Sequence, residues 1–223
     1  MMLVCLAAPG AFAGEGDIQL PSLEAPTFLG GSLTGRTILL LGLVICAGGA
    51  LFGILEYLKT RALPVHRSMA EVSHIIWETC KTYLLQQGKF LAALWLLIAV
   101  CMVYYFKYLQ ADDWGPVAMI LGCSILGILG SYGVAWFGIR INTTANSRAA
   151  FASLRGDSLK TLFIPLQAGM SIGMLLVCVE LSCMISILLF IPRELAGPCF
   201  IGFAIGESLG ASALRIGDRK SVV

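Results

Sequence analysis

Charge is scarce in this sequence. Only 13% of its 223 residues are Asp, Glu, Lys or Arg, whereas soluble domains carry about 25%. Apolar residues make up 58% of the chain, and the mean hydropathy is +0.87. The formal net charge is only +2, which gives no basis for nucleic-acid binding. These absences exclude an ordinary soluble domain and predict a protein embedded in a lipid bilayer.

The motifs of soluble catalysis and metal binding are also missing. The sequence has no glycine-rich phosphate loop leading into Lys-Ser or Lys-Thr, no Ser-His-Asp set and no run of aspartates that could hold Mg²⁺. His66 and His74 have no partner motif. The eight cysteines form no C-x-x-C pair, and we interpret those in apolar runs as packing residues: Cys46, Cys101, Cys123, Cys178 and Cys183. We predict no catalytic residue and no metal ligand in this chain.

The N-terminal stretch MMLVCLAAPGAFAGEGD has a short apolar run that ends in Ala11-Phe12-Ala13. A small-x-small pattern before Gly14 is typical of a secretory signal peptide, although the usual basic residues at the start are missing. We expect residues 1–13 to be a signal peptide and residues 14–36 to be an extracytoplasmic segment. An unprocessed apolar start is the alternative.

Five segments are long and apolar enough to cross a bilayer, which takes about 20 helical residues. They are residues 37–58, 90–107, 114–139, 161–191 and 195–215. The fourth is interrupted by Pro165, Gln167 and Glu180, so its ends are the least sharply defined. We predict an all-α fold, a polytopic bundle of transmembrane helices.

Basic residues gather in two of the connections between these spans. They follow the first span (Lys59, Arg61, Arg67) and the third span (Arg140, Arg148, Arg155, Lys160). Because cytoplasmic connections are enriched in Lys and Arg, we expect an N-terminus outside and a C-terminus in the cytoplasm of a multi-pass inner (plasma) membrane protein. Tyr104, Tyr105 and Trp114 fall where an outer aromatic belt would lie.

An amphipathic helix is predicted on the cytoplasmic side, before the second span. Ser68 and Glu71 have the S-x-x-E spacing of a capping box. Four apolar residues recur at helical spacing after Ser68: Met69, Val72, Ile76 and Tyr83. We expect a helix that starts at residue 68 and runs into the second span. A helical extension packed on its neighbours is favoured over a dedicated partner-binding helix.

Glycines recur at intervals of four residues in two spans. Gly202, Gly206 and Gly210 fall on one face of the fifth span, and Gly169 and Gly173 repeat the spacing in the fourth. Small residues at this spacing let two helix backbones approach closely in lipid. We predict that all five glycines lie at helix–helix contacts.

Glu207 interrupts the fifth span with a carboxyl group. Such groups are costly in a bilayer and usually face a bundle interior or an ion pathway. Arg215 lies eight residues further on, ~12 Å along the same helix face. Two interpretations are open: a neutral glutamate held by a neighbouring helix, and a residue of an ion pathway, which we favour. Glu180 is a weaker candidate of the same kind.

Four stretches resemble the ion-translocating membrane-bound pyrophosphatases. GFAIGESLGASALR is similar to that family's G-F-G-L-G-A-S-S-I-A-L-F-A-R, and its fixed points are Gly202, Phe203, Gly206, Ser208 and Arg215. MAEVSHIIWETCKTYLLQQGKF, INTTANSRAA and LQAGMSIGM are similar to three further segments in the family's order. The resemblance covers about residues 68–215.

The resemblance implies a pump with about sixteen helices, five of them present here, that forms a homodimer when full length. It implies cytoplasmic hydrolysis of pyrophosphate, clamped by Mg²⁺, with outward movement of H⁺ or Na⁺. It places Arg215 in the ion pathway. Some members carry an ion-gating carboxylate in this helix, for which Glu207 is the candidate.

The sequence departs from the family after Arg215. There the family continues R-V-G-G-G-I-Y-T-K, whose lysine contacts pyrophosphate, and an aspartate-rich segment follows; here Val223 stands at the lysine position. Gln167 replaces a family arginine. We expect the N-terminal portion of a pump that lacks the hydrolytic residues and Mg²⁺ ligands and is inactive by itself, with residues 217–223 as a non-native tail.

Two alternatives remain open. One is a small five-span secondary transporter or channel-like subunit that uses Glu207 together with Glu180. The other is a non-catalytic membrane scaffold.

Overall fold

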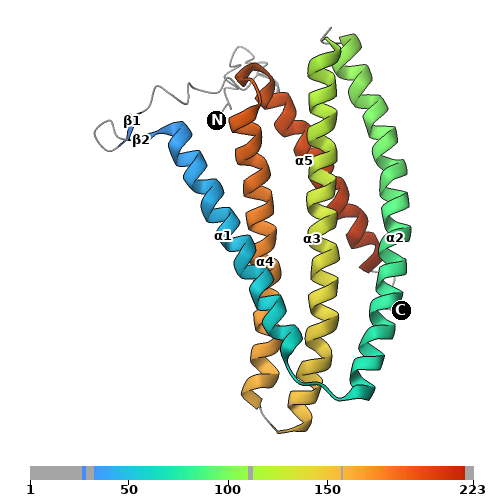
Figure 1. Cartoon of the computed structure of the whole chain (residues 1–223). Helices are drawn as coiled ribbons and strands as arrows, with labels where there is room; N and C mark the ends of the chain where they lie inside the picture. The colour runs from blue at the N-terminus through green and yellow to red at the C-terminus, as the bar shows by residue number, and fades with distance from the viewer. Residues whose placement is uncertain (1–26, 29–32, 110–112, 157, 219–223) are drawn as a thin grey trace, which may run out of the picture.

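The structure, a computed structural model, describes residues 27–28, 33–109, 113–156 and 158–218. Five long helices form a bundle in which consecutive helices run in opposite directions (Figure 1). Their bounds are α1 Gly35–Ala62, α2 Arg67–Val103, α3 Trp114–Leu154, α4 Ser158–Phe190 and α5 Arg193–Asp218. A π-helical segment, η3 (Tyr104–Leu109), extends α2. All five helices are long and apolar enough to cross a membrane, which confirms the predicted all-α transmembrane bundle.

One small element was not expected. Strands β1 (Thr27–Phe28) and β2 (Leu33–Thr34) pair antiparallel just before α1. Two residues per strand are too few to produce the alternation that marks a strand in a sequence.

The helices extend well past the predicted spans. The prediction ended the third span at residue 139, but α3 continues to Leu154, so the basic segment after that span is helical. Hydroxyl side chains there bond to carbonyls of their own helix: Thr144 donates to Arg140 O at 2.8 Å and Ser147 to Thr144 O at 3.0 Å. These polar residues therefore need no loop to satisfy them. The helix ends at Leu154, and Gly156 just beyond it has a φ of 73°, the left-handed conformation that favours glycine after a helix end.

The start of α2 differs from the predicted capping box. The N-cap is His66, whose Nδ1 accepts from Ser68 N at 3.4 Å, and Glu71 instead pairs with Arg67 at 3.1 Å. The helix begins one residue earlier than predicted, so Ser68 lies inside its first turn.

The buried face of α2 is also not the one that its amphipathic spacing suggested. Trp77, Leu84 and Leu91 are buried, whereas Val72 and Ile76 are exposed. In a membrane protein, apolar side chains face lipid as readily as the interior, so apolar spacing alone does not identify the packed face.

Two helix pairs make the closest packing, α1 with α4 and α3 with α5. In the first pair, Gly49 and Gly53 of α1 lie against Cys178 and Ser171 of α4. The Ser171 hydroxyl donates to Gly53 O at 2.6 Å. The sequence analysis did not single out these α1 glycines, although Gly49 and Gly53 have the same four-residue spacing as the others.

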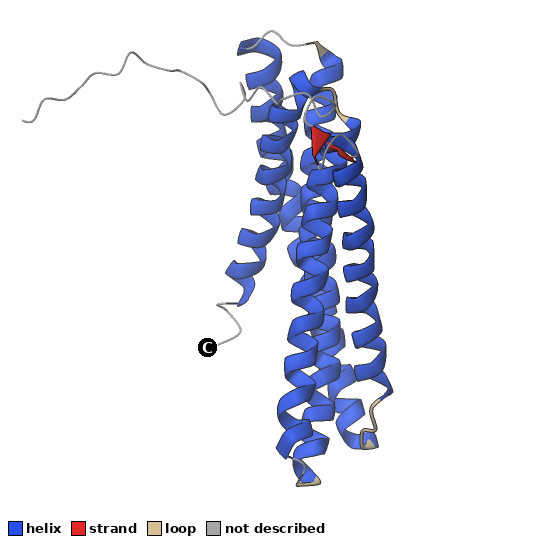
Figure 2. Ribbon diagram, turned by 90° about the vertical axis from the view of Figure 1, so that its left-hand side faces the viewer, coloured by secondary structure: helices blue, strands red, loops and turns tan. Residues whose placement is uncertain are grey.

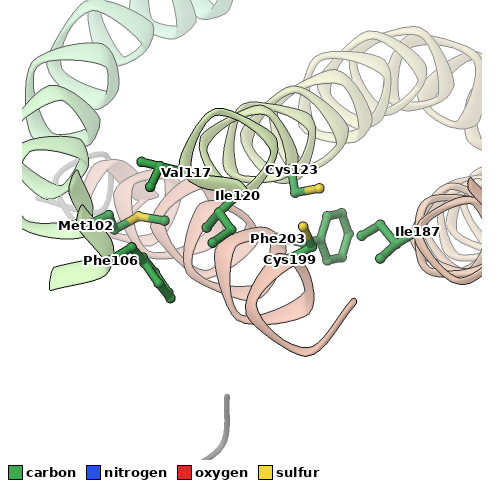
Figure 3. Close-up of a cluster of buried hydrophobic side chains, with 8 residues drawn as sticks. All are labelled: Met102, Phe106, Val117, Ile120, Cys123, Ile187, Cys199 and Phe203. Carbon is green, nitrogen blue, oxygen red and sulfur yellow. The ribbon is translucent and has the colours of Figure 1, made fainter. Parts of the chain in front are cut away.

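The second pair, α3 and α5, contributes most of an apolar cluster near the end of the bundle where α2 meets α3 (Figure 3). Ile120 and Cys123 of α3 meet Cys199 and Phe203 of α5. Residues of α2, η3 and α4 complete the cluster: Met102, Phe106 and Ile187. The α5 helix lies at a slant to the others and ends part of the way along the bundle (Figure 2). This packing fixes the depth at which α5 holds Glu207.

Candidate ion-pathway site between α4 and α5

Glu207 of α5 faces a second carboxyl group. Its side chain lines the same small cavity as that of Glu180, which projects from α4. Both residues belong to helices long and apolar enough to span a membrane. The two glutamates that the sequence singled out as ion-pathway candidates are therefore brought together.

The carboxyl pair lies beside a small cavity where α3, α4 and α5 meet. The cavity has a volume of about 10 Å³ and is lined by both glutamates, Ser131, Cys183 and Phe203, among others. This is room for about one water molecule. The polar groups at the site are thus the two carboxyls, one hydroxyl and one thiol.

Close approach of two backbones determines where Glu207 sits. A Cβ atom at Gly202 would lie 2.7 Å from the carbonyl oxygen of Ile120, and one at Gly206 would overlap the carbonyl of Ser124. From the other side, a Cβ at Gly127 of α3 would lie 2.9 Å from the backbone N of Glu207. Only glycine allows the two backbones to come this close. The contact therefore fixes the position of α5 on α3 and, with it, the position of the Glu207 carboxyl group.

The last glycine of the stripe is less tightly enclosed. A Cβ atom at Gly210 would lie 2.8 Å from the Ser131 side chain, which is not backbone. All three glycines of the stripe in α5 therefore face α3, as their spacing suggested.

The two glycines of α4 have different surroundings. Nothing among the described residues lies within 4 Å of a Cβ atom at Gly169 or Gly173. The face of α4 that packs carries Ser171 and Cys178 instead. The helix contact predicted for Gly169 and Gly173 is therefore not found within the described part of the chain.

The chemistry open to the carboxyl pair follows from the cavity that both groups line. Two carboxyl groups can hydrogen-bond to each other only if one of them carries a proton. No ion pair joins either glutamate to a basic side chain within the residues that the structure describes. Two neighbouring carboxyls titrate as a coupled pair, so this arrangement is suited to taking up and releasing a proton.

Comparison with known proteins places the chain in a family. The family model of the inorganic H⁺ pyrophosphatases matches residues 46–218. The chain belongs to the inorganic H⁺ pyrophosphatase family. The match includes Gly217 and Asp218, which the sequence analysis assigned to a non-native tail; residues 219–223 lie outside the described residues.

Two curated relatives of this pyrophosphatase chain are each named K(+)-insensitive pyrophosphate-energized proton pump. The protein of Chlorobaculum tepidum is 61% identical over 175 residues, which are 78% of this chain and 23% of that protein. The protein of Pyrobaculum aerophilum is 26% identical over 183 residues, 80% of this chain and 25% of that protein. The chain thus spans about a quarter of the length of these relatives. No solved structure matches it.

Two other predicted positions of the pyrophosphatase chain lie apart from the carboxyl pair. The backbone of Arg215 belongs to α5, eight residues beyond Glu207 or ~12 Å along the helix; its side chain lies outside the described residues. Gln167 is exposed on α4, thirteen residues before Glu180. Neither can be assigned a contact with the carboxyl pair.

The residues present do not fit a Mg²⁺ site. Among the described residues, no group of three His, Cys, Asp or Glu side chains could hold a metal ion. Mg²⁺ requires near-octahedral oxygen coordination, which the two carboxyls of this cavity do not supply by themselves. No step of the chemistry is therefore assigned to a metal in this part of the pyrophosphatase.

Sequence reasoning ranked Glu180 below Glu207, although a usable signal was present. Pro192 stands at the turn between α4 and α5, and Glu180 and Glu207 lie 12 residues before it and 15 residues after it. Two antiparallel helices of equal rise therefore place the carboxyls at similar depths, ~18 and ~22 Å from the turn.

Proposed function

We propose that this chain forms five spans of a longer pump that couples cytoplasmic pyrophosphate hydrolysis to outward movement of H⁺. The observation that carries the proposal is that Glu180 and Glu207 line one cavity inside the spans of a chain of the inorganic H⁺ pyrophosphatase family. The curated relatives are named as pyrophosphate-energized proton pumps, which supports the same activity here.

In this proposal, Glu207 is the ion-binding carboxylate and Glu180 holds the shared proton in place. Arg215 belongs to the same pathway, about two helical turns beyond Glu207. A cavity with room for about one water favours a proton over Na⁺, which would need several oxygen ligands besides the two carboxyls. Na⁺ is the alternative cargo.

Further features of the pump are proposed on the same basis. The names of both relatives favour a pump that is insensitive to K⁺. The basic residues at one end favour an inner-membrane protein with its N-terminus outside. We assign the hydrolytic residues and the Mg²⁺ ligands to parts of the pump outside the described residues, and we expect a homodimer.

The test uses the full-length protein encoded by the gene that contains this chain, purified and reconstituted into liposomes with a pH-sensitive dye. Addition of pyrophosphate with Mg²⁺ should acidify the lumen of vesicles in which the cytoplasmic face points outward, and omission of K⁺ should leave the rate unchanged. The 223-residue chain alone should show neither hydrolysis nor acidification. Proton flux by that chain without pyrophosphate would contradict the pump and favour a small secondary transporter. Pyrophosphate-driven formation of a Na⁺ gradient, without a pH gradient, would identify Na⁺ rather than H⁺ as the transported ion.

A further inference from the structure

A cavity of about 150 Å³ lies between α1, α2 and α3, far from the carboxyl pair. Three arginines from two helices line it: Arg61 of α1 and Arg140 and Arg148 of α3. His74 and Trp77 of α2 complete its wall. The cavity therefore carries three permanent positive charges.

Backbone hydrogen bonds position Arg148, and a ring contact positions Arg140. Neither contact neutralises the positive charge of the arginine. The Arg148 guanidinium donates from Nη1 to Thr144 O and from Nη2 to Arg61 O, both at 3.0 Å. Its Nε atom is buried and has no hydrogen-bond partner among the described residues. Arg140 lies over the Trp77 ring, 4.4 Å from its centroid. A buried donor without a partner is costly, so this cavity is built for an acceptor that the described residues do not supply.

Within the described residues, no acidic side chain neutralises the positive charges of this cavity. The glutamates of α1 and α2 near this end pair with basic residues of their own helices, as Glu56–Lys59, Glu71–Arg67 and Glu78–Lys81. None of the glutamates or aspartates that the structure describes lines the cavity.

An apolar groove of about 360 Å³ adjoins the basic cavity. It runs between α2 and α3 and is lined by Met69, Val72 and Ile76 of α2. Ser73 and Thr143 line both spaces, and the Ser73 hydroxyl donates to Thr143 O at 2.8 Å. A cationic cavity and an apolar groove thus share one wall.

Helix length places the cavity at a membrane surface. Arg140 lies 26 residues along α3 from Trp114, or ~39 Å, and Arg61 lies 25 residues from Arg36 along α1, or ~38 Å. A bilayer with its headgroups is about 40–45 Å thick. If exposed Trp114 and Arg36 lie at one surface, both helices bring the arginines to the opposite headgroup layer.

We propose that the cavity and its groove bind an acidic phospholipid. The phosphate lies among Arg61, Arg140 and Arg148, where it accepts a hydrogen bond from the free Nε of Arg148, and an acyl chain lies along Val72 and Ile76. Basic pockets between transmembrane helices suit anionic headgroups, and the adjoining groove selects an amphiphile over a free anion. The proposal does not depend on the proton pathway.

The test titrates the detergent-solubilised 223-residue protein with phosphatidylglycerol or phosphatidylcholine of identical acyl chains and counts bound lipids by native mass spectrometry. Phosphatidylglycerol should bind more than about tenfold more tightly. Arg61→Gln should lower its affinity about fivefold, because it removes one charge and keeps the backbone carbonyl that anchors Arg148. Arg155→Gln is the matched control; it removes one charge at the same end from a side chain that stacks on Phe151 outside the cavity, and it should leave the affinity unchanged.

Two further measurements distinguish a bound lipid from other bound anions. Ile76→Ser should weaken phosphatidylglycerol binding severalfold, and millimolar inorganic phosphate should not displace the lipid. Equal binding of the two lipids, or equal losses in Arg61→Gln and Arg155→Gln, would overturn the site. Displacement by inorganic phosphate would overturn the lipid assignment. The melting temperature of Arg61→Gln, measured alongside, should match that of the parent.

Discussion

The glycines of α5 and those of α4 share one spacing but not one environment. At Gly206 the neighbouring backbone is so close that a Cβ atom would overlap the Ser124 carbonyl, whereas the space beside Gly169 and Gly173 is open within the described chain. Spacing therefore shows that small residues share a helix face, but it does not show what lies against that face. The difference can be measured by adding the same side chain at each position.

The largest effect is expected at Gly206. Gly206→Leu must force α5 away from α3, because the obstacle is backbone that cannot rotate aside. Overpacking usually costs about 1–3 kcal/mol, and we expect this variant at or beyond the upper end. The measurement is the free energy of unfolding in detergent. A melting temperature equal to that of the parent would contradict the close α3–α5 contact.

A smaller loss is expected at Gly49 of α1. A side chain there meets the Cys178 sulfur of α4. Because the Cys178 side chain can rotate away, Gly49→Ala should lower the free energy of unfolding by about 1 kcal/mol. The double variant Gly49→Ala with Cys178→Ala should recover part of this loss. Strictly additive effects in the same unfolding measurement would show that the two residues are not in contact.

The smallest effect is expected at Gly169. Gly169→Leu in the 223-residue chain should change the free energy of unfolding by no more than about 0.5 kcal/mol, because nothing lies within 4 Å among the described residues. A loss as large as that of Gly206→Leu would remove the contrast between the two helices. A loss that appears only in the full-length protein would place further helices on this face of α4.

Much of the architecture was accessible from the sequence because bilayer thickness imposes it. Five apolar segments of sufficient length predicted five helices, and the glycine interval of α5 marked the face that packs on α3. Glu207 stood out because a carboxyl group inside an apolar span is costly and therefore points to a specific role.

Other features depend on contacts between segments that are distant in sequence. Val72 and Ile76 of α2 are exposed. The sequence alone could not distinguish their side of the helix from a packed side, because lipid accepts apolar side chains. The pairing of Glu180 with Glu207 requires the depth of α5 on α3, which backbone packing sets. The arginine cavity draws on helices separated by about eighty residues, and its three arginines were predicted to lie in the connections between spans.

The central claim is that Glu207, paired with Glu180, carries the proton of a pyrophosphate-driven pump. Its most direct test is pyrophosphate-driven acidification by the full-length protein in liposomes, compared for Glu207→Gln, Glu180→Gln and Glu180→Asp. We predict that Glu207→Gln abolishes acidification. Glu180→Gln should shift the pH profile of transport, and Glu180→Asp, which keeps the carboxyl, should restore it. Acidification by Glu207→Gln at the parental rate and with the parental pH profile would contradict the account.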